Sequence, residues 1–255
     1  MPMRWKEMML LGVAVLLFTA CHPRISTDIG EAGSNAERLL SKLYKQNNEL
    51  ETFKGIGEIR LWNARGARTA RIAWLAKVDG SRLRAEILGP SGRPLMKLAY
   101  DGRRFYFYSV TDEGVRQRRI RNPSLERAVE VPLTIRELIL FLAGRFPVYE
   151  HGEVKLAVSS GPQEPDRLVL TGDWSGLKQQ LNLTPDHDAV KSLSIYDRGD
   201  LRYHAELAEY RLLDGFLIPS RVRVSNGAAA GFEIRIARFW PNVAVRAQQF
   251  TISAP

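Results

Sequence analysis

The chain has very little cysteine: Cys21 is the only one among 255 residues, which excludes a framework of internal disulfides. Its four histidines show no paired spacing of the kind that metal-binding sites have. A P-loop with its lysine is absent, and residues 55–57 (Gly-Ile-Gly) lack the third glycine of a dinucleotide-binding loop. Residues 186–188 (Asp-His-Asp) follow a proline and are typical of a turn, not of a catalytic triad. We therefore expect no metal, no cofactor and no enzyme activity.

The sequence also lacks an apolar run long enough to cross a membrane comfortably. Residues 8–20 are almost wholly apolar, but these thirteen residues are fewer than the roughly 17 to 25 of a transmembrane helix. Arg4 and Lys6 precede the run, which is the order of charged and apolar regions in an export signal. We therefore predict that residues 1–20 are a signal peptide, removed on export.

The single cysteine follows this apolar run directly. Phe18, Thr19 and Ala20 stand before Cys21, and this arrangement resembles a bacterial lipobox, in which the cysteine is acylated and becomes the amino terminus. Two or more acyl chains anchor a protein stably, because each buried methylene contributes about 0.8 kcal/mol. The alternative is an ordinary secretory signal with a coincidental cysteine. His22 stands where aspartate would favour retention in the inner membrane, so it indicates delivery to the outer membrane.

Acidic residues are outnumbered by basic ones, and the net charge is +9. Such a balance favours nucleic acid, anionic lipid or acidic protein partners, and export argues against nucleic acid. The densest basic run, residues 116–121 (RQRRIR), lies beside the aromatic stretch 105–108. We interpret this run as the solvated face of a strand, and a weak attraction to lipid phosphate is the alternative.

The mature chain divides into a tether and one domain. Residues 22–35 (HPRISTDIGEAGSN) mix proline, glycine, serine and charges without an apolar period, so residues 21–35 are predicted to be an acylated cysteine and a flexible tether. Residues 36–255 show no second composition break and no internal repeat, and they are numerous enough for one sizeable core. A heptad pattern is absent, so we expect a monomer.

Most of this domain alternates between apolar and polar residues with the period of a β-strand. Asp101-Gly102 between two such stretches is a strong hairpin signal. The predicted strands are residues 53–61, 70–78, 83–87, 94–100, 103–110, 155–159, 167–171, 178–183, 189–197, 203–212, 218–224 and 232–239.

Three stretches have helical spacing instead. Residues 37–50 place leucines on one face, residues 123–129 allow one short turn, and an apolar helix follows Thr134. Thr134 and Glu137 have the spacing of a capping box, and Gly144 ends the apolar run. The predicted fold class is mainly β (α+β): an incomplete antiparallel β-barrel with helices covering the concave face.

One face of the predicted sheet is apolar. Its side chains form either a packed core or the lining of a cavity for acyl chains, and periodicity does not distinguish the two. The residues of this face are Ile72, Trp74, Leu83, Ile87, Leu98, Phe105 and Phe107.

Several stretches, taken in order, resemble the LolB family, the outer-membrane receptors that accept lipoproteins from the periplasmic carrier LolA. The resemblance begins with the lipobox cysteine and continues with FKGIGEIRL, ARIAWLAKVD and RLRAEILGPSGRPLMKLAYDG. It ends with the helix IRELILFLAGRFP and the hairpin AEYRLLDGFLIPSRVRV, which is followed by FEIRIARFWPN. Together these stretches cover most of the mature sequence.

The resemblance implies an incomplete barrel of about eleven strands with a helical lid. It also implies a hydrophobic cavity for acyl chains, to which Leu138 and Leu142 of the helix and the apolar strand face contribute. The implied partners are a LolA-like periplasmic carrier and acylated lipoproteins, which move between sheltered sites because exposed apolar area costs about 25 cal/mol per Å². The implied location is the periplasmic side of the outer membrane, with acylated Cys21 as the anchor.

The loop at residues 89–93 (GPSGR) departs from the family, whose members insert cargo with an exposed apolar residue at this tip. Pro90 and Gly92 match the family pattern, but Ser91 stands between them and would bring little favourable burial to a lipid surface. Leu95 and Met96 are the apolar residues that would substitute, and the alternative is that they begin the next strand. The resemblance therefore supports lipid binding by this chain more strongly than it supports insertion of cargo into a membrane.

Three functions remain open at this point. The first is a receptor of the LolB type. The second is a lipid-binding lipoprotein of the same fold that carries other amphiphiles without inserting them. The third is a tethered structural module with a filled core, whose basic face binds acidic partners.

Overall fold

The structure is a computed structural model that describes residues 29–110, 112–159, 161, 164–173, 176–227 and 229–252. The predicted signal peptide, Cys21 and residues 22–28 of the predicted tether lie outside these ranges. Export and acylation therefore stay predictions.

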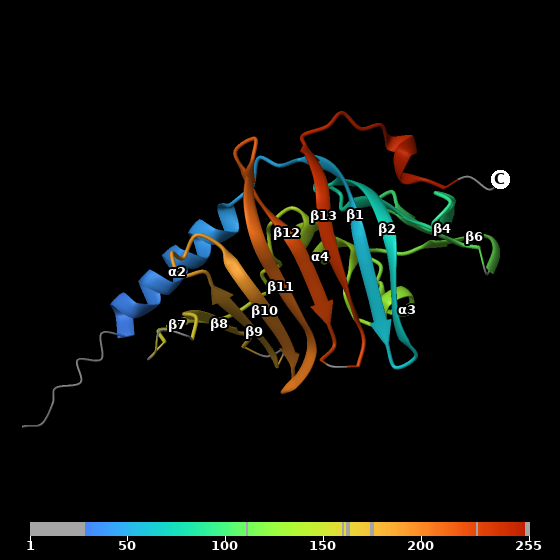
Figure 1. Cartoon of the computed structure of the whole chain (residues 1–255). Coiled ribbons are helices and arrows are strands. Elements are labelled where there is room, and N and C mark those ends of the chain that lie inside the picture. The colour runs from blue at the N-terminus through green and yellow to red at the C-terminus, as the bar shows by residue number, and fades with distance from the viewer. Residues whose placement is uncertain are drawn as a thin grey trace, which may run out of the picture.

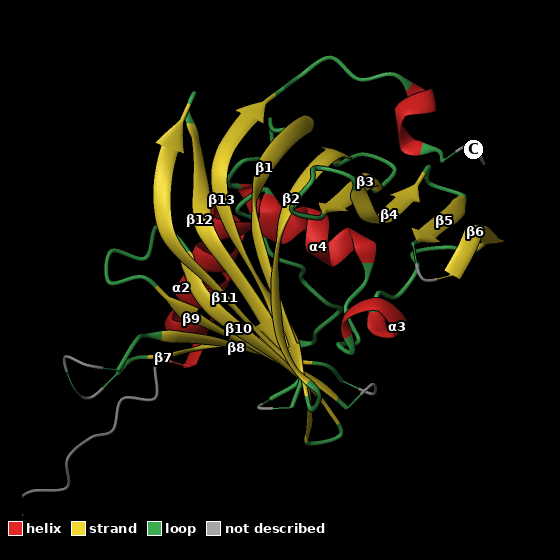
Figure 2. Cartoon of the chain, turned by 45° about the vertical axis from the view of Figure 1, so that its right-hand side comes forward, coloured by secondary structure: helices red, strands yellow, loops and turns green. Residues whose placement is uncertain are grey.

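The strands form one large antiparallel sheet that curves strongly (Figures 1 and 2). The chain runs as two meanders, β1 to β6 and β7 to β13, and β13 pairs with β1 to join them. Strands β6 and β7 stay at the two edges, so the barrel is open, as the sequence predicts. The strands are β1 (Thr52–Asn63), β2 (Gly66–Lys77), β3 (Arg82–Leu88), β4 (Pro94–Tyr100), β5 (Arg104–Ser109), β6 (Asp112–Arg119), β7 (Glu153–Ala157), β8 (Arg167–Thr171), β9 (Leu177–Leu183), β10 (Val190–Asp197), β11 (Asp200–Leu213), β12 (Phe216–Ser225) and β13 (Gly231–Pro241).

The described sheet has thirteen strands, where the resemblance implies about eleven. The strand that sequence periodicity does not single out is β6, which contains most of the basic run. Arg116, Arg118 and Arg119 are exposed there, in agreement with the interpretation of this run as a solvated strand face. Charged side chains on an edge strand oppose pairing with another sheet, and at the other edge α2 packs along β7.

The helices are α2 (Ile29–Lys45), α3 (Glu126–Val129) and α4 (Ile135–Leu142), and a 3-10 turn, η1 (Ala247–Phe250), follows the last strand. The predicted boundary between tether and domain is wrong, because residues 29–35 are already helical. The sequence also predicts that this helix continues to residue 50, whereas α2 ends at Lys45. The chain turns after Lys45, and Asn47 adopts a left-handed conformation with φ of 54°.

Helix α4 lies in the hollow of the sheet (Figure 2). The Thr134 side chain accepts a hydrogen bond from the Glu137 backbone N–H, and the Glu137 carboxylate accepts one from the Thr134 backbone N–H. The predicted capping box is thereby confirmed. At the other end Gly144 has φ of 67°, and a Cβ on this residue would lie 2.3 Å from the Leu217 carbonyl oxygen. The helix can therefore dock against β12 only with glycine at this position.

Glycine in β1 shapes the concave face itself. Gly55 pairs with Trp74 of β2 and Phe239 of β13. A Cβ on Gly55 would lie 2.2 Å from a Trp74 ring carbon, so the missing side chain is what lets the indole lie flat on the sheet. Phe53 and Phe239 stack beside it with ring centroids 5.2 Å apart.

We predict that Gly55→Ala lowers the free energy of unfolding by about 1–3 kcal/mol, because the added methyl overlaps the Trp74 ring. Chemical denaturation followed by circular dichroism measures the loss. Gly161→Ala is the matched control, since a Cβ there meets nothing within 4 Å. An equal effect of the two substitutions would contradict the close contact.

Candidate functional site around helix α4

The seven strand residues predicted to line a cavity share the concave face, where the pairing registers place them side by side. Trp74 lies opposite Ala85, Ala85 opposite Leu98, and Leu98 opposite Phe107, so one row crosses four strands. A second row joins Ile72, Ile87 and Met96. This agrees with the strand periodicity, because residues two apart in a strand point to the same side.

The centre of this face is filled. Ile72, Trp74, Leu83 and Leu98 are buried in the main core cluster, together with the α4 residues predicted for the cavity, Leu138 and Leu142. Helix α4 thus covers the concave face at its middle. Here the packed-core interpretation describes the structure.

The same apolar face continues past α4 toward β5. Ile87, Met96, Phe105 and Phe107 are half-buried and, with Ala85, form what we call the apolar strip. The strip is continuous with the row that contains buried Leu98 and Trp74. An apolar chain lying on the strip would therefore lead directly under α4.

Trp74 brings one polar atom into this apolar region. Its side chain is 4 % exposed, and the indole Nε1 has no hydrogen-bond partner among the described residues. Buried Trp N–H groups normally have an acceptor. The orphaned donor on the concave face therefore suits a ligand that carries an acceptor, such as an ester carbonyl.

The amino end of α4 is held by a buried carboxylate. Glu137 is 6 % exposed, and its Oε1 accepts hydrogen bonds from the Tyr203 hydroxyl at 2.8 Å and from the Tyr149 hydroxyl. Its Oε2 accepts from the backbone and side chain of Thr134, both at 2.7 Å. Burial, and then the charge of Glu137, raise the pKa of Tyr149 and of Tyr203, so both hydroxyls remain donors.

The carboxyl end of α4 is held by Asn47. Its side-chain amide donates to the carbonyl oxygens of Ala143 and Leu217, both at 2.8 Å, and its side-chain oxygen accepts from the Leu217 N–H at 3.1 Å. One side chain thereby joins the end of α2, the end of α4 and strand β12. With Glu137 at the other end, α4 is fixed at both ends.

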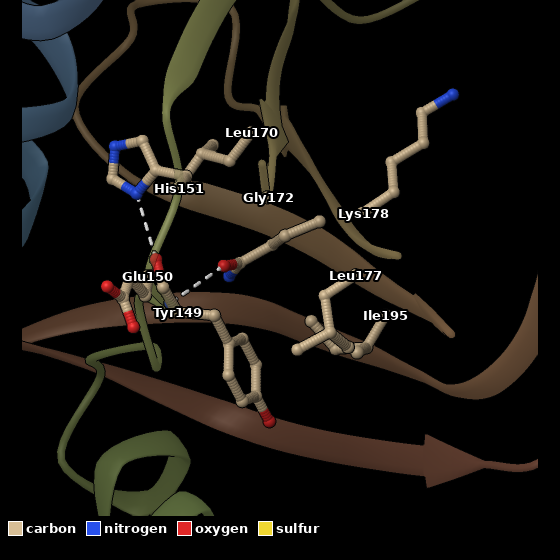
Figure 3. A pocket seen from close by; sticks show the side chains of 9 residues that line it. Tyr149, Glu150, His151, Leu170, Gly172, Leu177, Lys178 and Ile195 are labelled. Atoms are coloured by element: carbon tan, nitrogen blue, oxygen red, sulfur yellow. Dashed lines mark hydrogen bonds between the residues drawn. The ribbon is translucent and has the colours of Figure 1, made fainter. Parts of the chain in front are cut away.

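The segment after α4 is fixed to the sheet by Gln179 of β9. Gln179 donates to the Pro147 carbonyl at 2.6 Å and accepts from the Tyr149 N–H at 3.3 Å. Figure 3 shows Tyr149 with its ring directed away from His151. The pocket in that view has a volume of only about 10 Å³, enough for one water, so its role is structural.

A larger groove, of about 770 Å³, lies along the outer side of α4. It extends from the β2–β3 turn to the segment after α4, and Tyr44 of α2 closes one side. None of the nine residues predicted for the acyl cavity lines this groove. Sequence periodicity missed it because its walls come from separate parts of the chain.

The loop predicted for membrane insertion is a tight turn between β3 and β4. The Gly89 N–H donates to the Arg93 carbonyl, and the Gly92 N–H donates to the Gly89 carbonyl, both at 2.9 Å. Pro90, Ser91 and Gly92 are exposed at the tip. Leu95 and Met96 lie in β4, as the alternative interpretation expects, although Leu95 is still 45 % exposed.

The polar clusters elsewhere are cross-strand or turn contacts. His187 lies in the expected turn and pairs with Asp166 at 2.8 Å. The Ser194 hydroxyl lies 2.8 Å from Nδ1 of His204 across β10 and β11, and both strands are paired on both sides. The backbone N–H groups of β10 and β11 therefore already have hydrogen-bond partners in the sheet. Within the described ranges, His, Cys, Asp and Glu side chains form no group that would hold a metal ion.

The comparisons with known proteins support the fold. No protein-family model matches the chain, and a search of the curated proteins returns no match. None of the helices in the described ranges is both long and apolar enough to span a bilayer.

Three solved structures are similar over nearly their whole length. A LolA superfamily protein from Nitrosomonas europaea is 16 % identical, with 85 % of this chain and 97 % of that one covered and a TM-score of 0.58. A putative outer membrane lipoprotein-sorting protein domain from Vibrio parahaemolyticus is 14 % identical, with 88 % and 97 % covered and a TM-score of 0.55. A DUF1329 family protein from Desulfovibrio piger is 13 % identical, with 86 % and 97 % covered and a TM-score of 0.58. The chain therefore shares the fold of these three structures.

We predict that Glu137→Ala lowers the free energy of unfolding by about 3 kcal/mol or more, because it leaves two buried tyrosine hydroxyls and the helix cap without their acceptor. Chemical denaturation measures the loss. Exposed Glu150 is the control, and its change to Ala should alter stability by no more than about 0.5 kcal/mol. A loss below about 1 kcal/mol for Glu137→Ala would show that the network does not hold α4.

Proposed function

We propose that this chain is an outer-membrane lipoprotein that accepts acylated lipoproteins from a LolA-like periplasmic carrier and delivers them to the outer membrane. Acylated Cys21 anchors it on the periplasmic face. Cargo acyl chains bind between α4 and the concave face, and no covalent bond is made or broken. The observation that carries the proposal is the apolar strip, which continues the buried concave face past the flank of α4.

The strip is suited to be the entrance. Its side chains are half-buried without a ligand, so an arriving chain displaces little protein, and each methylene buried there contributes about 0.8 kcal/mol. Further in, the methylenes of the chain reach the buried ring of Trp74. Side chains under α4 must repack to admit more of the chain. That cost keeps the affinity below that of a bilayer, which release requires.

The fold of the three similar structures supports the same proposal. One of them is named as a lipoprotein-sorting domain and another as a LolA superfamily protein. A shared fold alone does not define cargo. The cargo is therefore inferred from the apolar strip together with the lipobox-like sequence at Cys21.

A second function is favoured by one observation, the polar tip of the β3–β4 turn. The exposed tip consists of Pro90, Ser91 and Gly92, on a five-residue loop closed by two backbone hydrogen bonds, and it carries no large apolar side chain. A lipid-binding lipoprotein that carries other amphiphiles, without inserting them, fits this tip as well as a receptor does.

We predict that the chain, reconstituted in liposomes, takes an acylated lipoprotein from a soluble LolA-like carrier. Flotation of the liposomes measures the transferred fraction. Phe107→Asp should weaken cargo binding by about tenfold or more, because it removes an apolar contact of about 1.5–3 kcal/mol from the strip.

Leu212→Asp is the matched control, since Leu212 is 72 % exposed at the far end of β11. It should leave transfer unchanged. Absence of transfer to the folded wild-type chain would reject the receptor. Equal losses in the two variants would place the acyl site away from the strip.

We predict that Ser91→Leu increases insertion of bound lipoprotein into liposomes, because an exposed leucine at the tip gains burial in lipid. Protease protection of the cargo measures insertion. Ser41→Leu adds the same side chain at an exposed position of α2 and should have no effect. Unchanged insertion with Ser91→Leu would show that this loop is not the membrane contact.

A further inference from the structure

The groove on the outer side of α4 carries an unusual set of charges. Three arginines line it: Arg136 of α4, Arg145 of the segment after α4, and Arg202 of β11. Asp79 and Glu137 are the two acidic residues of its wall. Among the residues that the structure describes, neither carboxylate lies within ion-pair distance of any of the three arginines.

Within the described residues, Glu137 forms no ion pair with these arginines. Both of its carboxylate oxygens are already occupied, by two tyrosine hydroxyls and by Thr134. The hydrogen bonds hold the carboxylate to the buried side of the groove wall, away from its opening. The open part of the groove is therefore positive.

Arg145 shows the effect of this arrangement. Its guanidinium lies 6.0 Å from the centre of the Tyr44 ring and is half-buried. Burial first, and then repulsion from Arg136, lower the pKa of Arg145, while Tyr44 and Asp79 act in the opposite direction. Half-buried Arg145 shares the groove lining with exposed Arg136, and an anion placed beside both would stabilise the two like charges.

Part of the groove wall is apolar, beside the polar residues Ser81, Asn122 and Thr134. Val78, Ile139, Leu140, Phe146 and Val148 line it beside the arginines. A volume of about 770 Å³ is within the range of ligand sites. A ligand that satisfies the whole groove therefore combines an anionic group with an apolar chain.

We propose that this groove binds an anionic phospholipid, with the phosphate between Arg136 and Arg145 and one acyl chain along the apolar wall. The inference rests on the proposed function only in that the chain handles lipid. It adds a second lipid site, on the opposite side of α4 from the core, with a defined headgroup chemistry. Bound phospholipid there would hold the mouth of the open barrel at the membrane surface.

Native mass spectrometry of the full chain in non-ionic detergent tests the proposal, because it counts each bound lipid. The probes are lysophosphatidylglycerol and a monoacylglycerol with the same acyl chain. Arg136→Gln and Arg145→Gln should each weaken binding of lysophosphatidylglycerol by about tenfold or more. Neither should change binding of the uncharged monoacylglycerol.

Arg238→Gln is the matched control, because it removes the same charge from an exposed position of β13 that does not line the groove. It should leave both affinities unchanged. Glycerol 3-phosphate, the headgroup without a chain, should compete at least about a hundredfold more weakly than lysophosphatidylglycerol, since it gains no apolar burial. Equal competition would assign the groove to a free phosphate compound and overturn the lipid site.

The outcomes separate this proposal from the receptor function. If monoacylglycerol binds but the two groove variants bind lysophosphatidylglycerol as the wild type does, the arginine site is wrong and acyl binding on the concave face stands. If lysophosphatidylglycerol binds with the predicted arginine dependence but lipoprotein is not transferred, the groove stands and the receptor is wrong. If Arg238→Gln weakens lysophosphatidylglycerol binding as much as the two groove variants do, the effect comes from net charge alone. That result would contradict a phospholipid site in the groove.

Discussion

The structure depends on how one open sheet covers its apolar concave face. An open barrel buries that face only if something occupies the hollow, and here the occupant is α4, an eight-residue helix. So short a helix covers the middle of the face and leaves the strip on β3 to β5 half-exposed. The fixed ends of α4, at Glu137 and at Asn47, set where the cover stops.

Local signals in the sequence predicted local structure well. Thr134 and Glu137 were expected to form a capping box because both partners lie within one helical turn, and the structure contains both hydrogen bonds. The concave face was found because alternation places Ile72 and Trp74 on one side of a strand. Residues 29–35 have no apolar period, so the sequence predicts a tether there, and the structure shows that the segment is part of α2.

Non-local features gave no such signal. The Tyr203 hydroxyl meets Glu137 across 66 positions in sequence, and Arg145 meets Tyr44 across 101, so no period or motif brings these residues together before the fold is known. The unpaired arginines of the groove are individually ordinary. The fold brings all three into the lining of one groove beside α4.

In the proposed function, acyl chains bind on the concave face against Trp74. The most direct measurement uses a variant that keeps Trp74 as its only tryptophan, mixed with an acylated peptide whose chain carries bromine, a contact quencher of indole fluorescence. We predict strong quenching of Trp74 by the brominated chain and none by the same peptide without bromine. Binding of the brominated peptide with unchanged Trp74 emission would place the acyl chain elsewhere and contradict the account.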